Sequence, residues 1–127
     1  MLFRSVDHLK KGMTVDFNFR TAASDLRPRD VLRLTEIADF LEQYPDLKIQ
    51  LDGYADIRGN SDYNLELSQS RLNSVKHLLV AKGVAPERII EIAHGKANSI
   101  EKDHDGYAFE RRVSIALSPD ESQDAVA

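Results

Sequence analysis

Alternating apolar and polar residues mark four segments of the chain as β-strands. From Met13 to Phe19 every second side chain is apolar, the two-residue period of a strand with one buried face. The same alternation runs from Leu47 to Leu51, and an isoleucine-rich run follows Arg88. The pattern predicts strands over residues 13–19, 47–54, 88–94 and 111–117.

Two segments between these strands follow the 3.6-residue period of an amphipathic helix. The first spans residues 28–44, because Pro28 suits the opening turn of a helix and Pro45 ends it. The second spans residues 62–82 and stops at Gly83, a suitable left-handed cap. The apolar stripe of the first helix consists of Val31, Leu34, Ile37, Ala38, Leu41 and Tyr44.

The order of these elements, β-α-β-α-β-β, predicts the fold class. Two helices long enough to cross a sheet bury every amphipathic face if both pack on the same side. We therefore predict an α+β fold, a two-layer α/β sandwich with a mixed four-stranded sheet and two long helices on one face. We expect the domain to span residues 13–118, after a linker or N-terminal extension over residues 1–12 and before a disordered acidic tail over residues 119–127.

One cation, Arg71, falls inside the buried stripe of the second helix. A guanidinium keeps its proton, so leaving it unpaired in the core would destabilise the fold by several kcal/mol. We therefore expect an anionic partner, and the nearest candidate by topology is Asp56, just beyond the second strand. The apolar residues of the same stripe are Leu67, Leu72, Val75, Leu78 and Leu79.

Two roles for Asp56 and Arg71 stay open at this point. The pair could be a structural ion pair that locks the loop to the helix. Alternatively, it could bind a zwitterion, because a carboxylate accepts from an ammonium group and the planar guanidinium donates twice to a carboxylate. Both roles predict that the two side chains lie close together, so ligand binding is what distinguishes them.

Composition narrows the function classes further. The 127 residues include 17 Lys and Arg against 21 Asp and Glu, a net charge of −4, which disfavours a nucleic-acid surface. With 42% hydrophobic and 30% charged residues, the chain has an ordinary globular composition, and no apolar run approaches the roughly 18 residues of a membrane helix. The absence of cysteine excludes disulfides, thiolate catalysis and cysteine-ligated zinc.

Other site chemistry finds little support in the sequence. The four histidines lack the paired helical spacing of a zinc protease, and we expect them at the surface. The run from Glu101 to Gly106 resembles the start of a calcium loop, but Arg112 occupies the twelfth position, where calcium needs glutamate. We expect no metal, no cofactor and no enzymatic activity. The histidines are His8, His77, His94 and His104.

A longer set of motifs runs from residue 53 to residue 113. Its residues are Gly53-Tyr54-Ala55-Asp56, Gly59, Tyr63-Asn64, Leu67-Ser68, Arg71, Val75, Leu79, Gly83-Val84, Gly95 and Arg111-Arg112-Val113. A dozen residue types in order over some sixty positions is far more specific than a short motif. The set resembles the OmpA C-terminal-like (OmpA/Pal/MotB) peptidoglycan-binding domain, and the resemblance covers about residues 13–118, nearly the whole chain.

The resemblance implies a noncatalytic domain that binds peptidoglycan through the diaminopimelate of its stem peptide. In the family, an aspartate that matches Asp56 receives the ligand ammonium, and an arginine that matches Arg71 binds its carboxylate. The family's remaining site positions match a loop asparagine, an arginine of the last strand, and a phenylalanine and acidic residue of the first strand, the acidic one replaced here. These four positions are Asn64, Arg111, Phe17 and Asn18.

Compartment and partners follow from the same resemblance. It implies a periplasmic domain of an outer-membrane or envelope-anchored protein, with peptidoglycan as its partner. We expect no nucleic-acid partner and no direct membrane insertion, and the family leaves room for a homodimer. The alternative is a protein-interaction or assembly domain on the same scaffold, in which Asp56 and Arg71 form a purely structural pair.

Overall fold

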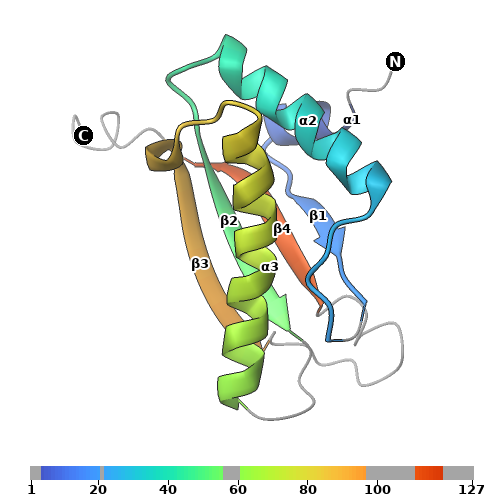
Figure 1. Ribbon diagram of the computed structural model, residues 1–127. Helices are drawn as coiled ribbons and strands as arrows, with labels where there is room; N and C mark the ends of the chain where they lie inside the picture. The colour runs from blue at the N-terminus through green and yellow to red at the C-terminus, as the bar shows by residue number, and fades with distance from the viewer. Residues whose placement is uncertain (1–3, 21, 56–60, 97–110, 119–127) are drawn as a thin grey trace, which may run out of the picture.

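Two long helices cover one side of a four-stranded sheet (Figure 1). The computed structural model describes residues 4–20, 22–55, 61–96 and 111–118. The helices within these ranges are α1 (Arg4–Lys10), α2 (Pro28–Gln43) and α3 (Ser61–Ala81), with a single 3₁₀ turn, η1 (Pro86–Arg88). The strands are β1 (Val15–Asn18), β2 (Lys48–Ala55), β3 (Ile89–Lys96) and β4 (Arg112–Ser118).

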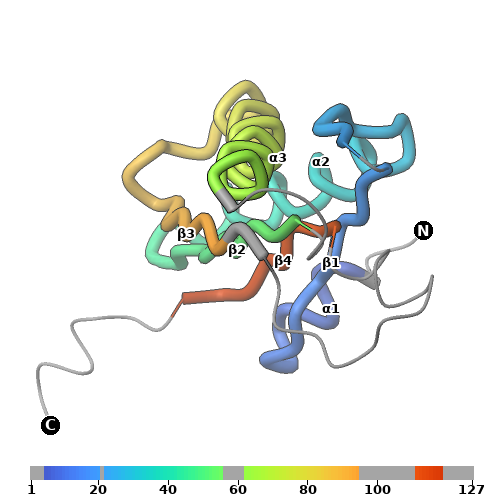
Figure 2. Tube along the Cα trace, turned by 90° about the horizontal axis from the view of Figure 1, so that it is seen from below, coloured from blue at the N-terminus to red at the C-terminus, as the bar shows by residue number. Residues whose placement is uncertain are grey.

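The sheet is mixed, with the strand order β1-β4-β2-β3. Strand β4 runs antiparallel to both β1 and β2, whereas β2 and β3 are parallel. Figure 2 shows α2 and α3 together on one side of this sheet. The predicted α+β class, mixed four-stranded sheet and arrangement of the two long helices are therefore confirmed.

The core lies between the sheet and these two helices, as the hydrophobic pattern predicts. Strand β2 alternates strictly, with every second residue from Ile49 to Ala55 buried. The calcium-like run and the acidic tail lie outside the described residues. The fully buried side chains of the core that come from α2, β2 and α3 include Leu34, Ile37, Leu41, Ile49, Leu51, Leu72, Val75 and Leu79.

The stripe predicted for the first helix is wrong at its last position. Tyr44 is 48% exposed, whereas Phe40 is buried. Tyr44 caps α2 with non-helical dihedral angles, so the helical wheel no longer describes its direction. Phe40 is sheltered by α1, whose Lys10 ammonium lies 5.5 Å from the centre of the Phe40 ring.

Helix α1 lies in the segment that we expected to be a linker or N-terminal extension. Its residues Val6 and Leu9, one turn apart, are buried, and the helix contacts α2, β1 and β4. Gly12 then adopts φ +80°, and the amide of Met13 donates to the His8 carbonyl at 2.9 Å, which closes the helix end. The N-terminal extension therefore contributes to the hydrophobic core.

Arg88 joins the end of α2 to the start of β2. Its Nη2 donates to the carbonyls of Leu41, Tyr44 and Leu47 at 2.8 to 2.9 Å, and its Nε donates to Leu47 at 3.0 Å. The last carbonyls of a helix have no partner within the helix, so a cation at this end satisfies and stabilises them. Arg88 thus fixes the position of Tyr44 and of the turn that follows it.

Replacement of Arg88 by alanine is expected to lower the free energy of unfolding by about 1–3 kcal/mol, because hydrogen bonds from a charged donor to three carbonyls are lost. Urea denaturation measures the change. Arg29→Ala, which removes an exposed arginine at the start of α2, is the matched control and should change stability by less than about 0.5 kcal/mol. Equal stability of the Arg88 variant and this control would contradict the prediction.

Candidate functional site

The candidate site is built where α3 crosses the end of β2. A Cβ atom added at Gly53 of β2 would lie 2.8 Å from the carbonyl oxygen of Ser68 and 2.7 Å from the Cγ atom of Leu72, both in α3. Glycine is therefore required by the close approach of the two backbones. This contact sets the first half of α3 directly against the carboxyl end of the strand.

Arg71 lies one turn beyond Ser68 and is fully buried, as its place in the hydrophobic stripe predicts. Its Nε donates to the carbonyl of Ala23 at 2.8 Å, its Nη1 to Tyr54 at 3.1 Å and its Nη2 to Arg20 at 3.1 Å. Arg71 thus connects α3 to the end of β2 and to the loop between β1 and α2. The predicted partner, Asp56, lies outside the described residues.

A third hydrogen bond to the same loop comes from Ser74 of α3, and an aromatic ring of the chain just before the loop lies beside Arg71. The hydroxyl of Ser74 donates to the Ser24 carbonyl at 2.6 Å, and the Arg71 guanidinium carbon lies 5.3 Å from the centre of the Phe19 ring. Sequence reasoning missed these partners, because backbone carbonyls leave no side-chain signature. The loop therefore has a defined position relative to Arg71.

Arg111 contacts the same stretch of backbone. Its Nε donates to the Phe19 carbonyl at 3.0 Å, and its own carbonyl accepts from the Phe19 amide at 2.8 Å. Arg71 and Arg111 therefore bind the carbonyls of two consecutive residues, Phe19 and Arg20. The structure thus brings together two of the predicted site residues from elements that are distant in sequence.

The other predicted site residues occupy different surroundings. Asn64 is buried on α3, two turns before Arg71. Phe17 is fully buried in the core, with the Arg33 guanidinium carbon 4.3 Å from its ring centre. Asn18 is exposed, and the alternation of β1 directs its side chain to the face of the sheet opposite Phe17. The side chains of Phe17 and Asn18 therefore lie on opposite faces of the sheet and do not contact each other.

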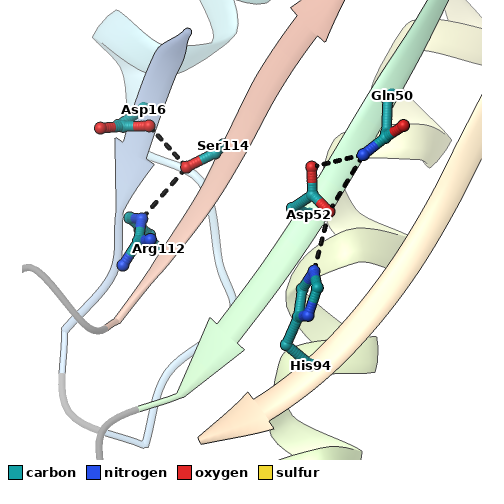
Figure 3. A network of polar contacts seen from close by, with 6 residues as sticks. All are labelled: Asp16, Gln50, Asp52, His94, Arg112 and Ser114. Carbon is teal, nitrogen blue, oxygen red and sulfur yellow. Dashed lines mark hydrogen bonds and ion pairs between the residues drawn. The ribbon is translucent and has the colours of Figure 1, made fainter. Parts of the chain in front are cut away.

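That opposite face carries a polar network that the sequence did not reveal (Figure 3). The Nε2 atom of His94 lies 2.8 Å from a carboxylate oxygen of Asp52, which also accepts from the Gln50 amide. His94 also stacks on Tyr54, with 4.5 Å between ring centres and 4° between ring planes. His94 is exposed, as expected, but it is part of a cluster at the ends of β2 and β3.

The guanidinium of Arg112 extends this cluster to β4. Its carbon lies 4.0 Å from the Tyr54 ring centre, and its Nε donates to the Ser114 hydroxyl, which in turn donates to Asp16. Burial raises the pKa of the Tyr54 phenol, and the Asp52 carboxylate raises that pKa further. Tyr54 therefore stays neutral between its neighbours on three strands.

The described ranges hold neither a cluster of metal ligands nor a membrane-spanning helix. These ranges contain no group of three or more His, Cys, Asp or Glu side chains arranged to hold a metal ion. None of the helices described there has both the length and the apolar composition needed to cross a bilayer.

The fold and the sequence both match known proteins. The probable lipoprotein YiaD of Escherichia coli is 36% identical over 118 residues, 91% of this chain and 54% of that protein. The peptidoglycan-associated lipoprotein of Buchnera aphidicola is 31% identical over 113 residues, 87% of this chain and 64% of that protein. This chain thus spans less than two thirds of either relative.

A solved structure gives the same result for the fold. The peptidoglycan-associated lipoprotein of Burkholderia pseudomallei superimposes with a TM-score of 0.74 and 25% identity, over 81% of this chain and 89% of that one. The model of the OmpA family matches residues 18–112, which include α2, β2, α3 and β3. The chain therefore belongs to the OmpA family.

Proposed function

We propose that this domain binds peptidoglycan non-covalently and thereby anchors a larger envelope protein to the cell wall. The observation that carries the proposal is the convergence of Arg71 and Arg111 on consecutive carbonyls, within a chain of the OmpA family. Two relatives named above are peptidoglycan-associated lipoproteins, which supports the same ligand class. The proposed action is binding without catalysis.

The ligand group that we propose is diaminopimelate of the stem peptide. Asp56 receives its ammonium group, and the guanidinium groups of Arg71 and Arg111 attract its carboxylate. The Arg71 guanidinium is buried beside the end of β2, and its planar, permanently charged group is suited to a carboxylate. Asn64, on the same helix as Arg71, belongs to the proposed site. Phe17 is fully buried and supports the site from the core without touching the ligand, and the exposed Asn18 is its most peripheral proposed member.

Sedimentation with purified sacculi tests this assignment. Asp56→Asn keeps the shape of the side chain but removes its charge, and we expect it to weaken binding at least tenfold, about 1.4 kcal/mol. Asp46→Asn removes an exposed carboxylate between α2 and β2 and serves as the matched control. If the folded Asp56 variant pellets with sacculi as well as the control, the site assignment fails.

Competition experiments identify the ligand group. Free diaminopimelate should displace the protein from sacculi more effectively than lysine, because lysine lacks the second carboxylate that the arginines would bind. Equal competition by the two amino acids would remove diaminopimelate from the proposal. It would leave peptidoglycan binding itself to be decided by the sedimentation experiment.

A second candidate is a protein-interaction or assembly domain in which Asp56 and Arg71 are purely structural. The observation that favours it is the direct connection of three chain segments by Arg71, which gives this side chain a structural role in any case. This alternative predicts that the parent protein does not pellet with sacculi and that Asp56→Asn lowers its stability. The two functions therefore differ in the first measurement.

We propose a periplasmic location for this domain, because peptidoglycan lies in that compartment. The names of the relatives, a probable lipoprotein and an outer membrane porin among them, support an envelope-anchored protein. Homodimer formation stays part of the proposal. Analytical ultracentrifugation of the domain distinguishes a monomer from a dimer.

A further inference from the structure

A groove between α1 and α2 has a volume of about 270 Å³. It lies along the second half of α2, which ends near the start of β2 and far from the carboxyl end of that strand (Figure 1). The groove is therefore remote from the site around Arg71. Its lining residues are Val6, Asp7, Lys10, Glu36, Asp39, Phe40, Gln43 and Tyr44.

The groove contains an aromatic pair. The rings of Phe40 and Tyr44 have their centres 5.0 Å apart and are tilted by 45°. The Tyr44 ring is half exposed, while its carbonyl is held by Arg88, so a large apolar surface is presented at a fixed position. Such pre-organised aromatic surface is favourable for docking, because little conformational freedom is lost on binding.

A cation already lies against this pair. The Lys10 ammonium is 5.5 Å from the centre of the Phe40 ring, within the range in which a cation is attracted to an aromatic face. Among the described residues that line the groove, Asp7, Glu36 and Asp39 are carboxylates, and Lys10 carries the one full positive charge. The groove therefore has an excess of negative charge around an aromatic floor.

We propose that this groove binds a lysine- or arginine-bearing segment of a partner protein. The carboxylates attract the cation, and the Phe40 and Tyr44 rings contact its aliphatic stem and its charge. The volume lies just below the range of about 300–1,000 Å³ typical of small-molecule sites, so it suits one or two side chains of an extended segment. Because the groove is remote from Arg71, such a partner could be held while the domain is on the cell wall.

Titration with pentalysine, acetylated and amidated at its ends, tests this proposal by NMR of the ¹⁵N-labelled domain. Amide shifts should concentrate at the groove residues of α1 and α2. The double variant Glu36→Gln and Asp39→Asn should weaken binding at least fivefold. The matched control, Glu66→Gln and Glu87→Gln, removes the same charge from exposed positions elsewhere and should weaken it less than twofold.

Replacement of Lys10 should have the opposite effect on pentalysine binding. Lys10→Gln removes the cation that competes for the Phe40 ring, so it should strengthen pentalysine binding at least twofold. Lys82→Gln changes the net charge equally at the exposed end of α3 and should have a smaller effect. Tyr44→Ser should weaken binding, because it removes the exposed ring without changing the charge.

Three outcomes would overturn the proposal. If the groove double variant and the control double variant weaken pentalysine binding equally, binding depends on net charge alone. If the groove double variant binds pentalysine as well as the parent, the groove is excluded as the binding site. If the parent self-associates and the groove double variant does not, the groove binds a second copy of the chain. Sacculus binding by the groove variants is a separate measurement, so its loss or retention bears on the proposed function alone.

Discussion

Replacement of Arg71 by alanine is expected to lower the free energy of unfolding by about 3–5 kcal/mol. The change removes three donors from the carbonyls of Arg20, Ala23 and Tyr54. Each buried acceptor left without a donor destabilises a protein by about 1–3 kcal/mol, and the missing side chain also leaves a cavity. Because natural domains are stable by only about 5–15 kcal/mol, this loss is a large fraction of the total stability.

Urea denaturation followed by circular dichroism measures this loss. Arg71→Lys keeps the charge but lacks the planar arrangement of donors, so it should recover only part of the stability. Arg27→Ala is a suitable control, since this half-buried arginine lies at the start of α2 and not at the junction of three segments. A loss below about 1 kcal/mol for Arg71→Ala would mean that the three carbonyls find other donors.

The second large effect is expected at Gly53. Alanine at this position places a methyl group within 2.8 Å of the Ser68 carbonyl oxygen, so β2 and α3 must move apart. Overpacking of this kind destabilises a protein by about 1–3 kcal/mol. The same movement displaces the neighbouring Tyr54 carbonyl, which accepts from Arg71, and therefore weakens a second contact.

A double variant separates the two clashes at Gly53. The Leu72 side chain also lies within 2.7 Å of the added methyl group, and Leu72→Ala removes that contact. If the backbone clash with Ser68 dominates, Gly53→Ala will lower the stability of the Leu72→Ala variant by about as much as it lowers that of the parent. Urea denaturation of the four proteins of this cycle measures the interaction. Gly53→Ala with the stability of the parent would contradict the close approach.

The regular elements of the fold were predictable from local periodicity. Strands with one buried face and long helices with an apolar stripe each carry a pattern within their own residues. Helix α1 was not predicted, because seven residues carry too few turns for such a pattern. Tyr44 was misplaced because the wheel assumes helical geometry, whereas this residue lies at the helix end.

The site could be predicted only where a side chain is unusual for its position. Arg71 stands out because a cation falls among leucines. Its backbone partners could not be found, since every residue has a carbonyl and the loop comes from a distant part of the chain. The cluster of Asp52, Tyr54 and His94 was missed for a related reason: it depends on the register between β2 and β3, which local sequence does not encode.

Arg71 holds the loop before α2 through main-chain atoms, and this leaves the side chains of the loop free to vary in sequence. The bonds to Arg20 and Ala23 end on main-chain oxygens, so substitutions of these two side chains leave the acceptors in place. The loop can therefore follow the same path with different residues. Relatives, or engineered versions of the domain, can carry other side chains at these two loop positions and keep the hydrogen bonds from Arg71.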